Sequence, residues 1–60
     1  MIQESKKYIS HGFANRDDYL QYLAREYNVA VDIVYQLANT FGEDEDFDAL
    51  VTELVDINHG

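Results

Sequence analysis

The chain of 60 residues has no cysteine, no proline and no tryptophan, and it has only four basic residues. Without cysteine there can be no disulfide and no thiolate metal site, so stability must come from close packing or from association. No apolar run approaches the ~20 residues that span a bilayer, and residues 1–7 lack the apolar stretch of a signal peptide. Because no cysteine marks an oxidising compartment, we expect a cytoplasmic protein.

The basic residues are confined to the first part of the chain. Residues 1–25 hold all four of them against three carboxylates, a net charge of +1, whereas residues 26–60 hold nine carboxylates and no Lys or Arg, a net charge of −9. This asymmetry repels phosphate backbones and acidic membrane surfaces, and it favours a basic partner. We therefore predict a protein partner with a basic surface, and no direct binding to nucleic acid or membrane.

Hydrophobic periodicity predicts four helices in one small domain that covers residues 1–60. The predicted helices lie at 2–11, 16–27, 30–41 and 46–57, and no period-2 alternation bounded by turns indicates a strand. Gly12 and Gly42 follow the first and third helices, where glycine accepts a positive φ at little cost. Asn15 is placed to cap the second helix, with Asp18 three residues on. The predicted fold class is all-α, a small three- to four-helix bundle.

Each helix after the first carries an apolar stripe at helical spacing, and these stripes form the expected core. They consist of Leu20, Leu23, Ala24 and Tyr27; Val34, Leu37, Ala38 and Phe41; and Phe47, Leu50, Val51, Leu54 and Ile57. In the first helix Ile2, Ser5 and Ile9 share a face. We expect Tyr8, Tyr19 and Tyr27 at the rim of the core with their hydroxyls in water.

The most structured motif resembles the helix-turn-helix of bacterial regulators, and it consists of Leu23, Ala24, Asn28, Val29, Val34 and Leu37. The resemblance implies that Ala24 lets two helices cross closely and that Asn28 stands at the turn, where it replaces the usual Gly because asparagine also enters the left-handed region. The positions that would face bases include Gln36 and Asn39 but no basic residue, although Lys and Arg normally supply most non-specific affinity for DNA. We interpret the motif as helix packing, with a DNA-binding helix-turn-helix protein as an alternative that the charge disfavours.

A second pattern spans a longer stretch of the chain. His11-Gly12-Phe13, then Asn28-Val29, then a helix with Ile33, Val34 and Leu37 is similar to the ubiquitin-associated (UBA) family. The resemblance implies a UBA-like three-helix core. It also implies ubiquitin binding through the loop and the end of the third helix, here Gly12, Phe13 and Leu37. His11 replaces the usual Met, and the fourth helix is not required by the family.

No group of residues predicts an enzyme, a cofactor or a metal site. Asp44, Asp46 and Asp48 match the first three ligand positions of an EF-hand loop, but Ala49 and Val55 stand where the loop needs Gly and Glu. Neither serine lies in a nucleophile-elbow sequence. A domain of this size also lacks room for a pocket of ~300 Å³ or more.

The segment Glu43–Asp48 concentrates the acidic charge. With the residues that follow, it resembles short uncharacterised acidic bacterial proteins of the mobile-element type, a resemblance that implies no known activity. A dense acidic face speeds encounter with a basic surface, and tyrosine is enriched at interfaces. We therefore predict a protein–protein interaction module with the partner-binding residues Tyr22, Tyr35, Glu43, Asp44, Glu45, Asp46, Asp48, Glu53 and Asp56. A DNA mimic that inhibits a nucleic-acid-binding protein is the main alternative, and a self-associating helical subunit is another.

Overall fold

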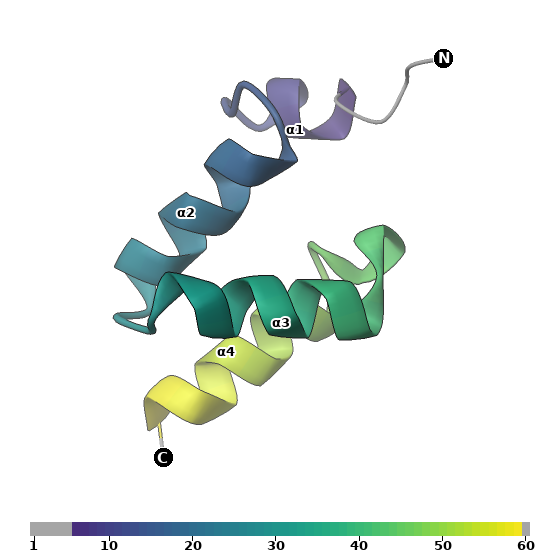
Figure 1. The fold of residues 1–60 in the computed structure, drawn as a ribbon. Helices are drawn as coiled ribbons and strands as arrows, with labels where there is room; N and C mark the ends of the chain where they lie inside the picture. The colour runs from purple at the N-terminus through teal and green to yellow at the C-terminus, as the bar shows by residue number, and fades with distance from the viewer. Residues whose placement is uncertain (1–5, 60) are drawn as a thin grey trace.

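The computed structural model describes residues 6–59, which form helices and turns and no strand. The helices are α1 (Lys6–Ser10), α2 (Arg16–Glu26), α3 (Val31–Phe41), the 3-10 turn η1 (Glu43–Glu45) and α4 (Ala49–His59). Figure 1 shows α3 lying across the middle of the molecule, with α1 and the start of α2 toward one end and the last turns of α4 toward the other. The predicted all-α class is confirmed.

The residues that mark the ends of α1, α2 and α3 act as the sequence predicts. The Asn15 side chain accepts a hydrogen bond from the Asp18 backbone N–H at 2.9 Å, which satisfies one of the free donors of the first turn of α2. Gly12 and Gly42 have φ angles of +91° and +92°, and Asn28 turns the chain between α2 and α3 with a φ of +56°. Asparagine is one of the few residues other than glycine that enter this region.

The first helix differs from the prediction in the residue that it buries. The structure describes α1 from Lys6 only, so Ile2 and Ser5 of the predicted helix lie outside the described residues. Ile9 is 61% exposed, whereas Tyr8 is fully buried. The helix therefore contacts the rest of the protein through an aromatic side chain rather than through the predicted aliphatic face.

The fourth helix begins three residues later than predicted, at Ala49. Residues 43–48 form η1 and a turn instead, with the Asp46 N–H donating to the Glu43 carbonyl and the Asp48 N–H donating to the Glu45 carbonyl. The Asp48 carbonyl then accepts from Thr52 N at 3.0 Å and starts α4. This path turns the Asp46 side chain inward, away from the solvent-facing side of the predicted helix.

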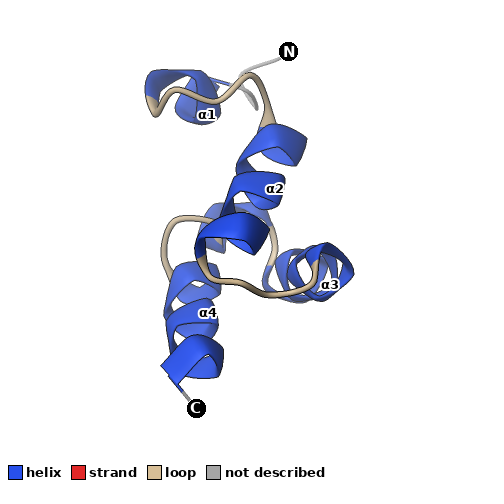
Figure 2. Cartoon of the chain, turned by 90° about the vertical axis from the view of Figure 1, so that its left-hand side faces the viewer, coloured by secondary structure: helices blue, strands red, loops and turns tan. Residues whose placement is uncertain are grey.

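The core lies where α3 packs against α2, α4 and η1, and Figure 2 shows α2 and α4 beside α3, which is seen end-on. Its buried apolar residues are Tyr8, Tyr19, Leu20, Leu23, Ala24, Val34, Ala38, Leu50 and Leu54. The predicted stripes supply seven of these nine residues, but Ile57, which was expected in the third stripe, is 42% exposed in the last turns of α4. No helix within residues 6–59 is long and apolar enough to cross a bilayer.

Candidate functional site

The acidic segment is attached to the helices by one buried carboxylate, Asp46, whose exposure is 0%. Arg16, in the first turn of α2, donates two hydrogen bonds to this carboxylate: Nε to Oδ2 at 2.6 Å and Nη2 to Oδ1 at 2.9 Å. The same Nη2 donates to the Ala38 carbonyl in α3 at 3.1 Å. One guanidinium therefore joins α2, α3 and the acidic segment, and the hydrogen bond to Asp46 raises the pKa of Arg16.

Two tyrosine hydroxyls complete the surroundings of Asp46. The Tyr8 hydroxyl donates to Asp46 Oδ2 at 2.5 Å, and the Tyr19 hydroxyl donates to the Asp46 backbone carbonyl at 2.9 Å. Both hydroxyls were expected in water, but each instead donates to Asp46 inside the protein. Burial raises the pKa of Tyr8, with the hydrogen bond to Asp46 adding to the effect, and burial together with the Asp46 charge raises the pKa of Tyr19.

Phe47 fixes the next position of the segment by aromatic contacts. Its ring stacks on Tyr19 with centroids 4.4 Å apart and on His11 with centroids 4.5 Å apart. Lys7 Nζ lies 5.9 Å from the centroid of the Phe47 ring and donates to the Glu43 carbonyl at 2.7 Å. The acidic segment is therefore held at residues 43, 46 and 47 by side chains from α1, α2 and the loop between them.

The remaining acids of the segment lie at or near the surface. Asp44 and Asp48 are exposed, and Glu43 and Glu45 are half-buried; we call these four residues the acidic turn. On α4, Glu53 is half-buried and Asp56 is exposed. Asp46 was predicted to belong to the same partner-binding surface, but its side chain is inside the protein and cannot contact a partner there.

The two tyrosines predicted as interface anchors lie at different places. Tyr22 is 36% exposed, and its ring contacts that of Phe13 with centroids 5.0 Å apart. Tyr35 is half-buried, and its hydroxyl donates to Asp17 Oδ1 at 2.5 Å, which raises its pKa. Tyr35 is therefore already engaged with α2, and within residues 6–59 no hydrogen bond or aromatic contact joins either tyrosine to the acidic turn.

The residues of the UBA-like resemblance are divided between surface and core. Gly12 is exposed, whereas Phe13 and Leu37 are half-buried and pack against the core. The three aspartates at 44, 46 and 48 do not form a metal site, and within residues 6–59 no group of three His, Asp or Glu side chains could hold a metal ion.

Sequence reasoning missed Arg16, Tyr8 and Tyr19 as the residues that position the acidic turn. Their partners in the network lie 27 to 38 residues away in the chain, so no local spacing reveals the connection. Composition was the one available signal. An arginine and two tyrosines lie in the first third of the chain, whereas residues 26–60 contain no Lys or Arg to pair with the acids there.

Comparisons with protein-family models, with curated proteins and with solved structures gave no significant match for this chain.

Proposed function

We propose that this protein is an interaction module that binds a basic surface of another protein through the acidic turn. The observation that carries the proposal is that neighbouring aspartates differ in burial. Asp46 is buried, and the hydrogen bonds to its carboxylate fix the backbone of the acidic segment, whereas Asp44 and Asp48 on either side face solvent. A charged surface that is already ordered loses little conformational entropy on binding.

The charges of the acidic turn are also free of ion pairing among the described residues. The salt bridge found in residues 6–59 joins Arg16 to Asp46, and Lys7 contacts the Glu43 carbonyl rather than its carboxylate. An unneutralised group of like charges attracts an oppositely charged partner over about a Debye length, ~8–10 Å at physiological salt. We therefore expect the acidic turn to act mainly on the association rate.

The test uses the whole protein, tagged, to capture a partner from its native lysate, followed by measurement of association rates at stepped salt. In the test variant Asp44→Asn and Asp48→Asn are combined and Asp46 is kept, because removing the buried carboxylate would disturb the fold. We expect the association rate to fall roughly tenfold at low salt and the difference to shrink as salt rises.

A matched control removes acids elsewhere on the surface. Asp18 is kept in this control because it takes part in the cap at the start of α2. Glu26→Gln combined with Asp32→Asn lowers the negative charge without touching the acidic turn, and both side chains are exposed. A control that slows association as much as the test variant, or a test variant that associates at the wild-type rate at every salt concentration, contradicts the proposal. Competition between duplex DNA and the protein for the captured partner would identify a DNA mimic.

A further inference from the structure

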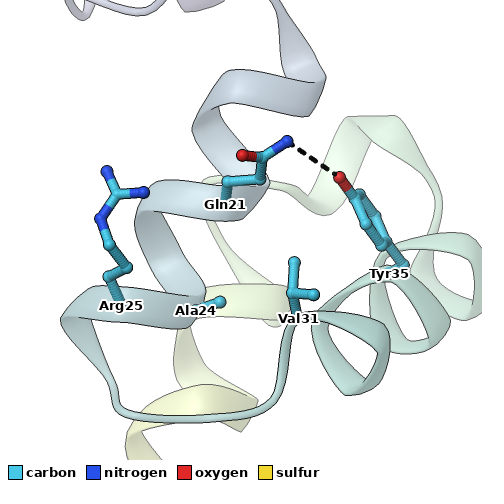
Figure 3. Close-up of a pocket in the computed structure, with 5 residues that line it drawn as sticks. All are labelled: Gln21, Ala24, Arg25, Val31 and Tyr35. Atoms are coloured by element: carbon cyan, nitrogen blue, oxygen red, sulfur yellow. Dashed lines mark hydrogen bonds between the residues drawn. The ribbon is translucent and has the colours of Figure 1, made fainter.

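A pocket of about 240 Å³ lies between α2 and α3, on a different part of the surface from the acidic turn. Gln21, Ala24 and Arg25 line it from α2, and Val31 and Tyr35 line it from α3 (Figure 3). The pocket is open to solvent, and its volume falls below the ~300 Å³ at which pockets begin to enclose whole ligands. Its size therefore suits one side chain of a larger molecule.

Hydrogen bonds hold one wall of this pocket in place before anything binds. The Tyr35 hydroxyl donates to Asp17 Oδ1 at 2.5 Å and also accepts from Gln21 Nε2 at 3.5 Å, the contact drawn in Figure 3. Gln21 Nε2 lies 3.2 Å from Asp17 Oδ2 as well. The aromatic ring is thus fixed between two helices, although it is only half-buried.

Apart from the Gln21 amide, the lining of the pocket is apolar with one cation. Ala24, Val31 and the Tyr35 ring provide apolar surface, and Val31 is 40% exposed although it is a branched aliphatic residue. Arg25 is the charged lining residue; it is exposed and forms no salt bridge within residues 6–59. A guanidinium binds carboxylates through paired hydrogen bonds, which distinguishes it from a lysine at the same place.

We propose that this pocket binds the C-terminal residue of a partner protein, with an apolar side chain against Val31 and Tyr35 and the free carboxylate on Arg25. The lining pairs apolar surface with a single positive charge, and a chain terminus carries an apolar group and a carboxylate on one residue. The open side leaves a path for the rest of the partner chain. This site goes beyond the acidic turn, because it recognises a negative group instead of a basic surface.

The primary test is a titration of the ¹⁵N-labelled protein with the tripeptide N-acetyl-Gly-Gly-Phe, followed by NMR. We expect amide shifts centred on the pocket residues and no binding of the same tripeptide with a C-terminal amide. Equal binding of the amide form, or shifts that do not centre on the pocket, would overturn the proposal. Phenylacetate that binds as tightly as the tripeptide would overturn the chain terminus as the occupant and assign a small carboxylic acid.

Two variants with one control locate the interaction on the protein. Arg25→Gln should weaken tripeptide binding roughly tenfold, because it removes the charged partner of the carboxylate. Lys6→Gln removes the same charge from an exposed position on α1 and should change affinity less than about twofold. Val31→Phe should prevent binding by filling the pocket. Equal losses in Arg25→Gln and Lys6→Gln would show a general charge effect and refute the site.

Discussion

The two ends of the molecule are stabilised in different ways. At the end formed by α1, the start of α2 and the acidic turn, a buried carboxylate is surrounded by Arg16, Tyr8 and Tyr19, and no buried side-chain polar atom in residues 6–59 lacks a partner. At the other end, the Asn58 side chain bonds the Tyr27 carbonyl at an exposed position, and Val55 and Ile57 remain about 40% exposed. The first end fixes one geometry through buried directional bonds, whereas at the second end the hydrogen bond is exposed and the apolar side chains are less buried.

The largest expected effect comes from removing the centre of the directional end. Asp46→Ala leaves the Arg16 guanidinium without its partner, and breaking one side of a buried pair destabilises by roughly 3–5 kcal/mol. A 60-residue domain has a total stability of only ~3–9 kcal/mol, so we expect the variant to lose a large share of its free energy of unfolding. Urea denaturation followed by circular dichroism measures this. Asp44→Ala, on the exposed neighbour, should change stability by less than ~0.5 kcal/mol, and similar losses in both variants would disprove the role of Asp46.

Removing single hydroxyls separates the contributions around Asp46. Tyr8→Phe deletes a hydrogen bond to a charged oxygen and should destabilise by about 1.5–3 kcal/mol. Tyr19→Phe deletes one to a neutral carbonyl and should destabilise by about 0.5–1.5 kcal/mol. The same denaturation experiment gives both values, and the reverse order would mean that the Asp46 carboxylate is not the stronger acceptor.

The smallest effect at neutral pH is that of tyrosine ionisation, which changes the stability only in alkaline solution. The pKa values of Tyr8 and Tyr19 are raised above the ordinary value of 10.0, so folding favours their protonated forms. Their contribution is fully present below about pH 10 and is lost as the pH rises above it, because the unfolded tyrosines ionise first. We expect the thermal midpoint to fall above pH 10, and to fall less steeply in Tyr8→Phe. An unchanged midpoint at pH 11 would contradict this assignment.

Local signals in the sequence predicted the middle of the fold well. Asn15, Asn28 and Gly42 delimit α2 and α3 through hydrogen bonds and φ angles that depend only on near neighbours. The start of α4 could not be predicted in this way, because it depends on Asp46 pairing with Arg16, 30 residues earlier. In the sequence, Asp46 looks the same as Asp44 and Asp48, and only the tertiary contacts make it different.

The sequence predicted which residue types make up the candidate site, but it did not predict how they are arranged in space. The acidic charge of residues 43–48 is visible in the sequence, as is the exposure of Tyr22 on the polar side of its helix. The inward turn of Asp46 and the bond that ties Tyr35 to Asp17 depend on how α2 meets its neighbours. The pocket with Arg25 was missed for the same reason, because its two walls come from different helices.

The long sequence separation of the Asp46 contacts also has a consequence for the folding kinetics. The α2–α3 pair closes across a short turn, whereas the Tyr8–Asp46 bond joins residues 38 positions apart and must wait for a large loop to close. Contacts that form after the rate-limiting step leave the folding rate unchanged and slow the unfolding rate. We therefore expect the Asp46 network to slow unfolding more than it speeds folding, so that it sets how long each molecule remains folded.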